Sequence, residues 1–373
     1  MKLLVIGLGG CGGRLADEFA RLNQRARRQR RITVIIDLLA INTNTADLRA
    51  LRNVKSDDQH RIRIGGRKAG IHGVGNISEL AAEIARRDAD KVINAIRQIP
   101  RQSEADAFLL IAGAAGGTGS GSIPVISKSI RERHRDKPLY NLIVLPFEHE
   151  ERTEERAIYN SATCLKLASE VTDAIFMVDN QRYVRKDASL RNNLDRINTR
   201  IVEPFYNILC AGEERNVKYI GTRLLNVTDI TLTLSGWTVI SQGRSQPRSA
   251  GFPFGLLRLH KEREKESESS KGVEAMEAAV EELSLSCNPE DAGRALYLLT
   301  GPGREMNLTL IEKLGDYLKT LAPDAIMRSG DYPRGKGYMD VSIILSQLAT
   351  VEKVKRYYSE AAKVISTIQK TQT

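Results

Sequence analysis

Five glycines stand within nine residues at Gly113–Gly121, and this run constrains the chain more than any other feature. An apolar stretch typical of a buried strand, 107–112, leads into the run, and a helical pattern follows from Ser122. A glycine loop between a strand and a helix lets consecutive N–H groups surround an anion, and the hydroxyls of Thr118 and Ser120 can add hydrogen bonds. Glycine at this density has no evident packing purpose, so we interpret the run as a phosphate-binding loop. It is not a Walker loop, because the lysine of that motif is missing.

A second glycine loop, Gly7–Gly13, follows the first predicted strand and precedes a helix from Arg14. By itself this pattern resembles the fingerprint of NAD-dependent enzymes, which also requires an acidic residue at the end of the second strand. Asp37 is available for that role, so an NAD-dependent oxidoreductase is one alternative. It leaves the run at 113–121 unexplained, because a dinucleotide fold needs only one such loop.

Short apolar, β-branched runs alternate with amphipathic helical patterns over the first part of the chain, which is typical of a parallel sheet covered by helices. The predicted strands are 3–6, 33–36 with 39–41, 107–112, 140–145, 174–178, 237–240, 295–299 and 339–345. We expect an α/β protein with a Rossmann-like domain over 1–185, a long central helix over 186–212 that Pro204 can kink, and a smaller C-terminal α/β domain over 213–373. The charged run 261–270 is expected to be an exposed loop or the start of a helix.

The composition is that of a globular protein, with 41% hydrophobic and 27% charged residues. No apolar stretch approaches the roughly 20 residues of a membrane-spanning helix, and the first residues read as a strand and not as a signal peptide, so we expect a cytoplasmic protein. The four cysteines form no C-x-x-C pair, which argues against a zinc site or a disulfide framework. The net charge is +10 with a basic block at 25–31, but no aromatic interleaving accompanies it. We therefore expect no nucleic acid partner, and at most indirect contact with a membrane.

The segment Ala112–Pro124 resembles the signature loop of the tubulin/FtsZ superfamily, with Ala115 in place of a glycine. Other nucleotide loops of that family have counterparts in the same order: Gly9–Gly13, Asn42–Asn44 and Gly73–Asn76. Asn44 stands where the family usually has an acidic residue. The resemblance assigns the following residues to the nucleotide phosphates: Gly9, Gly10, Cys11, Gly12, Asn42, Asn44, Gly73, Gly75, Asn76, Gly113, Ala114, Ala115, Gly116, Gly117, Thr118, Gly119 and Ser120.

Three further residues resemble the positions that hold the nucleoside in this family. Glu150 lies in Pro-Phe-Glu-His-Glu and would meet the ribose hydroxyls, while Asn180 ends Phe-Met-Val-Asp-Asn and would read the guanine edge. Asn198, on the predicted central helix, matches the second guanine-reading asparagine. An amide side chain presents both donors and an acceptor, which suits the mixed edge of guanine. The resemblance therefore implies a site for GTP or GDP with Mg²⁺, although no residue is assigned as a magnesium ligand.

The segment Leu224–Ile230 resembles the catalytic loop that the family inserts into the nucleotide site of the neighbouring subunit. Either Asn226 matches the first asparagine of that loop, or Asn226 and Asp229 replace two acids spaced three apart. We prefer the second reading, in which Asp229 orients the attacking water; in the alternative, Asp229 only caps the following helix. The resemblance implies a GTPase that polymerises head-to-tail, with polymerisation carried by 213–373.

Within the superfamily the chain looks most like the archaeal CetZ group, which is associated with cell shape, because it lacks the terminal peptide of FtsZ and the acidic tail of tubulin. Cell shape or division is therefore the expected role. A non-catalytic, nucleotide-regulated binding protein is a further alternative, since the catalytic loop differs from that of FtsZ.

Overall fold

The computed structural model describes residues 1–66, 73–184, 190–245, 260–335 and 337–371. Its strands form one ten-stranded sheet in the order β3-β2-β1-β4-β5-β6-β7-β10-β8-β9. The pairs from β3 to β7 are parallel, β10 lies antiparallel to both β7 and β8, and β9 is parallel to β8. The strands are β1 Leu3–Leu8, β2 Ile35–Asn42, β3 Arg61–Arg63, β4 Ala107–Gly113, β5 Leu139–Leu145, β6 Ala174–Asp179, β7 Gly236–Arg244, β8 Ala292–Gly301, β9 Ile326–Pro333 and β10 Asp340–Leu348.

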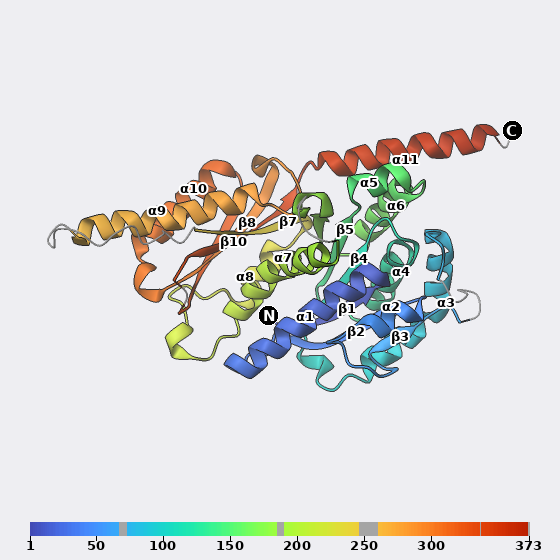
Figure 1. Ribbon diagram of the computed structural model, residues 1–373, viewed down its shortest axis with the longest axis horizontal. Helices are drawn as coiled ribbons and strands as arrows, with labels where there is room; N and C mark the ends of the chain where they lie inside the picture. Colours follow the sequence, from blue (N-terminus) through green and yellow to red (C-terminus); the bar gives the residue numbers. More distant parts are fainter. Residues whose placement is uncertain (67–72, 185–189, 246–259, 336, 372–373) are drawn as a thin grey trace.

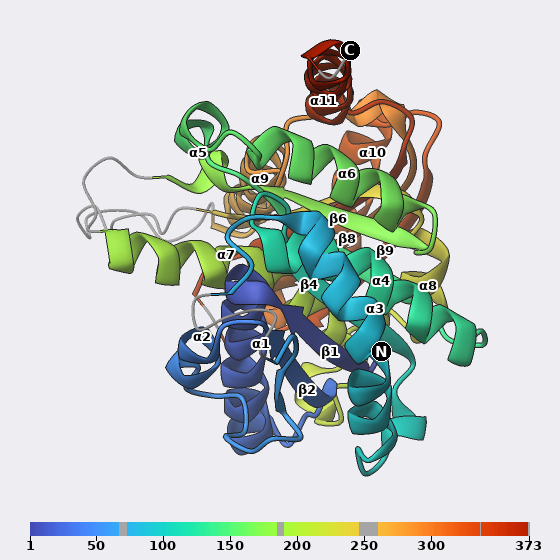
Figure 2. The ribbon, with the colours of Figure 1, turned by 90° about the vertical axis from the view of Figure 1, so that its right-hand side faces the viewer.

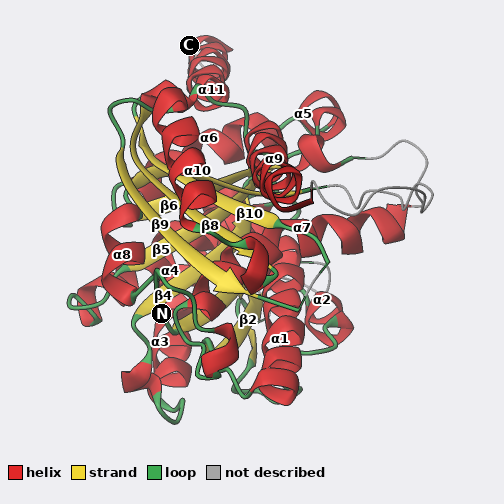
Figure 3. Ribbon diagram, turned by 90° about the vertical axis from the view of Figure 1, so that its left-hand side faces the viewer, coloured by secondary structure: helices red, strands yellow, loops and turns green. Residues whose placement is uncertain are grey.

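Helices cover both faces of this curved sheet (Figures 1 and 3). One apolar core joins the sheet to α1 Gly9–Arg30, α2 Thr45–Ala50, α7 Leu190–Ala211 and α8 Val227–Thr233. The other joins it to α3 Ser78–Arg97, α4 Gly117–Arg133, α6 Ala157–Ser169, α9 His260–Glu281, α10 Leu308–Leu321 and α11 Glu352–Thr371. The short helix α5 Glu148–Thr153 lies beside α6, and α11 runs past both of them and beyond the body of the protein (Figures 1 and 2).

The predicted strands could be recognised in the sequence because they are buried on both faces. β1 and β5 are buried at every residue, so they read as continuous apolar runs, as strands of a covered parallel sheet do. The predicted pieces 33–36 and 39–41 are one strand, β2. The sequence missed only β3 and β9, which are the two edges of the sheet. An edge strand has one unpaired side and tolerates polar residues, so its pattern is weak.

The predicted α/β fold with a long central helix is confirmed. The helix α7 contacts α1, β7 and β10, and it continues through Pro204. The charged run 261–270 lies within α9 and not in a loop. None of the helices in the described part of the chain has the length and apolar composition needed to cross a membrane. The division of the chain at residues 185 and 213 stays a prediction.

Candidate functional site

A cavity of about 260 Å³ opens at the carboxyl ends of β1 and β4, where α1 and α4 begin. The order of the sheet reverses between these two strands, and in open α/β sheets ligands bind at such a point. The cavity is lined by Leu8, Gly9, Gly10, Cys11, Asn42, Thr43, Asn44, Asp47, Gly73, Val74, Gly75, Asn76, Gly113, Gly116, Gly117, Thr118 and Gly119. Four loops that are far apart in the sequence, including both glycine loops, therefore surround one space.

Two helix N-termini meet at this cavity without side-chain caps. The N-cap residues are Leu8 for α1 and Gly116 for α4, neither of which offers a capping side chain, and neither first turn contains an acidic residue. The first N–H groups of a helix have no partner within the helix, and the helix dipole places partial positive charge there. The cavity is therefore built to receive an anion on backbone N–H groups.

Several glycines of the two loops serve packing, which corrects our interpretation that the dense run has no such purpose. A Cβ atom on Gly12 would lie 2.0 Å from the carbonyl oxygen of Ile111, and one on Gly121 would lie 2.0 Å from that of Ser78. These glycines let α1 approach β4 and let α4 approach α3. Gly116 differs from them, because a Cβ there would meet no atom within 4 Å. The run therefore combines close helix packing with an open backbone at the cavity.

Side chains tie the loops around the cavity to one another. The hydroxyl oxygens of Thr43 and Thr118 lie 2.7 Å apart. The buried Asn160 of α6 donates from Nδ2 to the carbonyl oxygens of Asn76, at 2.9 Å, and Ala115, at 2.8 Å. Nothing in the sequence marks Asn160 as a site residue, because a lone asparagine in a helix carries no motif. These bonds hold the loops at residues 43, 76 and 115–118 in one arrangement.

The acidic group of the cavity is Asp47, which the sequence analysis also missed. Its Oδ2 accepts a hydrogen bond from Nδ2 of Asn42 at 3.0 Å, which fixes the carboxylate at the cavity wall. Asn44 lines the wall too, but its Oδ1 caps α2 by accepting from the N–H of Ala46 at 2.8 Å. No lysine or arginine is among the described lining residues. Apart from Asp47, the described part of the wall therefore acts on a ligand through neutral groups.

Four of the predicted phosphate residues are not among the residues that line the cavity: Gly12, Ala114, Ala115 and Ser120. Ala114 is fully buried, and its N–H donates to the carbonyl of Val144 at 2.8 Å. Ser120 is also buried, and its hydroxyl donates to the carbonyl oxygen of Gly116. Through these hydrogen bonds, Ala114 and Ser120 hold the backbone of the loop in place.

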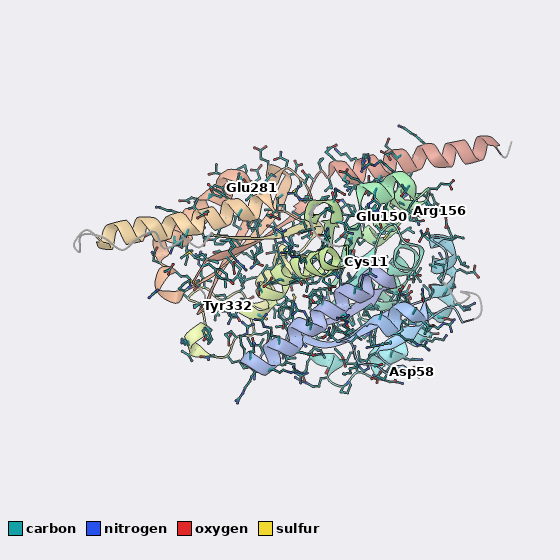
Figure 4. The ribbon with its side chains drawn as sticks, viewed as in Figure 1. Cys11, Asp58, Glu150, Arg156, Glu281 and Tyr332 are labelled. Carbon is teal, nitrogen blue, oxygen red and sulfur yellow. The ribbon has the colours of Figure 1, made fainter. Side chains whose placement is uncertain are left out.

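None of the three predicted nucleoside residues is among the described residues that line this cavity. Burial raises the pKa of the Cys11 thiol, Arg14 opposes that shift, and the carboxylate of Glu150 adds to it. Figure 4 shows Cys11 and Glu150 on the same side of the molecule. Asn180 begins a 3₁₀ turn directly after β6, and Asn198 is half-buried on α7. Residues 185–189, between these two elements, lie outside the described part of the chain.

Asp37 cannot act as the ribose ligand of an NAD site. It lies near the start of β2, paired in register with Leu4, whereas the cavity lies beyond Asn42 at the other end of that strand. Its Oδ2 is held by Lys55 Nζ at 2.9 Å and His60 Nε2 at 3.1 Å. Five residues of extended strand span about 17 Å, so the acidic residue that a dinucleotide site requires is missing from this position.

Asn226 and Asp229 lie at the amino-terminal ends of the parallel strands, whereas the cavity lies at their carboxyl ends. The helix α8 ends two residues before β7 begins at Gly236, which pairs with Ala174 at the start of β6. Leu225 and Met1, which lies two positions before the start of β1, both adjoin Gly212. The cavity lies beyond the far end of β1, a strand of about 18 Å. Asp229 therefore cannot reach the cavity of its own chain.

Asp229 and Asn226 form a capping box at the start of α8. Asn226 Oδ1 accepts from the N–H of Asp229 at 2.9 Å, and Asp229 Oδ2 accepts from the N–H of Asn226 at 3.1 Å. The second oxygen, Oδ1, lies 3.8 Å from Nε of Arg328, and the Asp229 side chain remains 31% exposed. Asp229 therefore caps α8, as the alternative interpretation expects, while its side chain stays partly exposed.

Large apolar side chains are exposed around α8. Leu224 precedes the helix, Leu232 lies in its last turn, and Ile326 begins β9, which contacts α8. Nη1 of Arg294, which pairs with Ile326 across the sheet, donates to the carbonyl of Leu232 at 2.6 Å, so α8 and the start of β9 share one surface. A group of exposed apolar residues of this kind is typical of a protein–protein contact.

Comparisons with known proteins agree with this geometry. Residues 2–186 match the model of the Tubulin/FtsZ family, GTPase domain, and residues 187–363 match that of the Tubulin-like CetZ, C-terminal domain. The tubulin-like protein CetZ1 of Haloferax volcanii is 31% identical over an alignment that covers 99% of this chain and 94% of the relative. Among solved structures, GDP-bound monomeric CetZ1 from Haloferax volcanii superimposes with a TM-score of 0.80 at 29% identity, covering 98% of this chain and 99% of that one. CetZ2 from the same organism, solved as a GTPγS-bound protofilament, also gives a TM-score of 0.80, at 25% identity with 99% and 100% covered.

Proposed function

The chain belongs to the CetZ group of the tubulin/FtsZ family, and on this premise we propose that it binds and hydrolyses GTP and polymerises head-to-tail in the cytoplasm, in the service of cell shape or division. The observation that carries the proposal is the separation of Asp229 from the cavity. The phosphate site lies at the carboxyl ends of the parallel strands, and the candidate catalytic carboxylate lies at their amino-terminal ends. The two can therefore form one active site only between two copies of the chain.

In this proposal the guanine nucleotide enters with its phosphates on the two glycine loops. Backbone N–H groups at the starts of α1 and α4 hold the phosphate oxygens, and the Thr43–Thr118 contact keeps the loops together. Glu150 binds the ribose, and Asn180 and Asn198 bind the guanine edge. The relatives described as bound to GDP and GTPγS support this assignment.

The cavity suits Mg²⁺ carried in with the nucleotide. Magnesium prefers oxygen ligands and is usually held by one or two carboxylates together with substrate phosphates, and Asp47 is a carboxylate held ready at the wall. Among the described residues, no three His, Cys, Asp or Glu side chains gather to hold a metal by themselves. We propose that Asp47, with the hydroxyls of Thr43 and Thr118 nearby, replaces the acid that is absent at Asn44. Bound magnesium would neutralise phosphate charge that the neutral wall leaves uncompensated.

Hydrolysis in this proposal takes place at the junction of two chains. Asp229 of the neighbouring copy orients the attacking water at the γ-phosphate, and Asn226 fixes Asp229 through the capping box. Asp229 needs only to position the water and forms no covalent bond, since phosphoryl transfer is catalysed mainly by positioning and electrostatics.

Such a contact joins two different surfaces of the chain, so it is heterologous, and one that does not close into a ring gives a filament. The apolar part of the contact comes from the exposed side chains around α8, which are Leu224, Leu232 and Ile326. We propose that residues 213–373 carry this polymerising surface and residues 1–185 the nucleotide.

Gly116 offers a sharp test of the shared site, because a side chain there enters open space at the cavity without a clash. Gly116→Glu should abolish GTP binding by placing a carboxylate among the phosphate-binding groups, while Gly116→Ala should bind nearly as the parent does. With GTP and magnesium, the parent and Gly116→Ala should sediment as polymer and Gly116→Glu should not.

Mixing two inactive variants tests the sharing directly. Gly116→Glu keeps Asp229, and Asp229→Ala keeps the cavity, so a mixture should recover part of the GTP hydrolysis that each lacks alone. A mixture as inactive as its components would contradict catalysis across the junction. The second candidate, a nucleotide-regulated binding protein with little turnover, is favoured by the engagement of Asp229 in the cap; it predicts nucleotide-dependent polymer with no hydrolysis in the parent.

A further inference from the structure

A second cavity lies at the far end of α1 from the nucleotide site. It has a volume of about 360 Å³, and its walls include Arg25 and Arg30 of α1, Glu203 and Tyr206 of α7, Tyr219 and Arg334. The helix connects the two sites, with Gly9 and Gly10 at one cavity and Arg30 at the other, about 30 Å apart at 1.5 Å per residue. Figure 4 shows Tyr332, which adjoins this cavity, well away from Cys11 at the nucleotide site. The basic block at 25–31 thus opens onto a cavity that the proposed GTP chemistry does not use.

Arg334 is a buried cation whose hydrogen bonding is incomplete. Its side chain is 10% exposed and stacks on the ring of Tyr332, with Cζ 3.4 Å from the ring centroid. Nη1 donates to Oε2 of Glu214 at 3.3 Å, but Nη2 is buried and has no hydrogen-bond partner in the described part of the chain. A buried guanidinium nitrogen without a partner is costly.

Glu214 cannot supply the missing partner, because both of its oxygens are in use. Oε1 accepts from the backbone N–H groups of Arg215 and Asn216, each at 3.1 Å. Oε2 accepts from the hydroxyl of Tyr332, at 3.0 Å, as well as from Arg334. Consistently, burial lowers the pKa of Arg334 to about 9 in spite of the ion pair.

Two more guanidinium groups face the same cavity. Arg30 donates from Nη1 to the hydroxyl of Tyr332 at 2.8 Å, and Arg25 has its Nε 3.3 Å from the side-chain oxygen of Gln29. Neither of these partners is a carboxylate, so both arginines keep donors and positive charge for an incoming anion. Glu203 is the one acidic residue among the described residues of the wall.

We propose that this cavity binds a small phosphate-bearing anion on Arg25, Arg30 and Arg334. Guanidinium groups pair with phosphate through forked hydrogen bonds, and a tetrahedral oxyanion offers oxygens in several directions at once, whereas a single carboxylate offers two in one plane. The anion would supply the partner that Nη2 of Arg334 lacks. The site is separate from the nucleotide cavity and does not depend on GTP being the nucleotide.

Inorganic pyrophosphate is the probe, with binding followed by isothermal titration calorimetry on the full chain. Arg25→Gln removes an exposed cavity arginine, and Arg28→Gln removes an exposed arginine of the same helix that does not line the cavity. Both variants lower the net charge of +10 by one, so their difference reports position and not overall charge. We expect Arg25→Gln to weaken one binding event about tenfold and Arg28→Gln to change it less than twofold.

Arg30→Gln is the second test, and citrate is the control ligand. Arg30→Gln should weaken the same event, and the Gly116→Glu variant should retain it, because that substitution blocks only the other cavity. Pyrophosphate binding that is equal in the parent, Arg25→Gln and Arg30→Gln would overturn the site. Citrate binding as tightly as pyrophosphate at this event would overturn its assignment to phosphate chemistry.

Discussion

The hydroxyl oxygen of Thr43 lies 2.7 Å from that of Thr118, a contact that spans 75 positions of the sequence. Thr43 belongs to the loop after β2, and Thr118 to the first turn of α4, so the contact joins two separate walls of the cavity. Thr43 is almost fully buried. Such a bond keeps the loops in the arrangement that binds before any ligand arrives, which reduces the cost of binding.

Replacing Thr43 by Val keeps the shape of the side chain and removes the hydroxyl. We expect the free energy of unfolding to fall by about 0.5–1.5 kcal/mol, and GTP affinity to fall several-fold, since the loops are then held less firmly. Thermal unfolding and nucleotide titration measure the two effects. Thr43→Ser, which retains a hydroxyl, is the control and should bind more tightly than Thr43→Val. Equal GTP binding by Thr43→Val and the parent would show that the contact does not organise the site.

Asp47 is predicted to make GTP binding depend on magnesium. In the parent, added Mg²⁺ should tighten GTP binding, and Asp47→Asn should lose most of that gain, about tenfold, because the amide cannot offer the metal a negative charge. Without magnesium, Asp47→Asn should bind GTP at least as tightly as the parent, since a carboxylate that repels the phosphates has gone. GTP titrations with and without magnesium give all four affinities. An unchanged magnesium effect in Asp47→Asn would remove this residue from the metal site.

Asp47 and Asn160 also show where the sequence stops being informative. The glycine loops could be recognised because close backbone approach and free N–H groups demand glycine at fixed places next to strands. Asp47 lies only three residues beyond Asn44, but its position at the cavity depends on the turn into α2 and on the bond from Asn42, which no spacing reveals. Asn160 acts through its side-chain amide on two distant carbonyl groups, and only the folded arrangement of α6 brings them together.

Asp229 shows the same limit in another form. The sequence allowed a catalytic carboxylate or a helix cap, and the structure shows that the capping box is made while the side chain stays partly exposed. The fold itself was readable from the buried parallel strands, while the edge strands β3 and β9 were not. Buried strands can be recognised from the order of apolar residues. The role of a side chain, in contrast, depends on which residues from other segments, or from a second copy of the chain, lie near it.

Two substitutions at Asp229 separate its two roles. Asp229→Asn keeps an oxygen that can accept from the N–H of Asn226, and Asp229→Ala does not, so only the alanine variant should lose about 0.5–1 kcal/mol of stability. Both should bind GTP as the parent does, because Asp229 lies at the opposite ends of the parallel strands from the cavity. Both should hydrolyse GTP at least tenfold more slowly under conditions in which they polymerise, since neither has a carboxylate. Full hydrolysis by Asp229→Asn would exclude a catalytic carboxylate at this position.

Glu151 fastens α11 to α5, and its ionisation predicts a pH dependence. Burial alone would raise the pKa of this carboxyl, but bonds from Tyr357 and Arg356 and the charge of Lys353 together hold the pKa below its ordinary value of 4.5. A lowered folded-state pKa means that the stabilisation is complete above about pH 4.5 and is lost as the pH falls through the folded-state value.

The difference in melting temperature between the parent and Glu151→Gln should therefore be constant near neutral pH and shrink below pH 4.5. Glu148→Gln, at an exposed acid of the same helix, is the control and should show little difference at any pH. A difference between the parent and Glu151→Gln that persists unchanged to pH 3 would contradict the assigned ion pairs.

The central claim is that one active site is built from two copies of the chain, and the rate of GTP hydrolysis per subunit at increasing protein concentration tests it most directly. With GTP and magnesium in excess, the rate per subunit should be near zero at low concentration, rise as copies associate and level off once most subunits are in polymer. Glu substitutions at Leu224 and Leu232, in the exposed apolar surface, should shift this rise to higher concentration. A rate per subunit that is the same at every protein concentration would show that a single chain hydrolyses GTP by itself and would contradict the account.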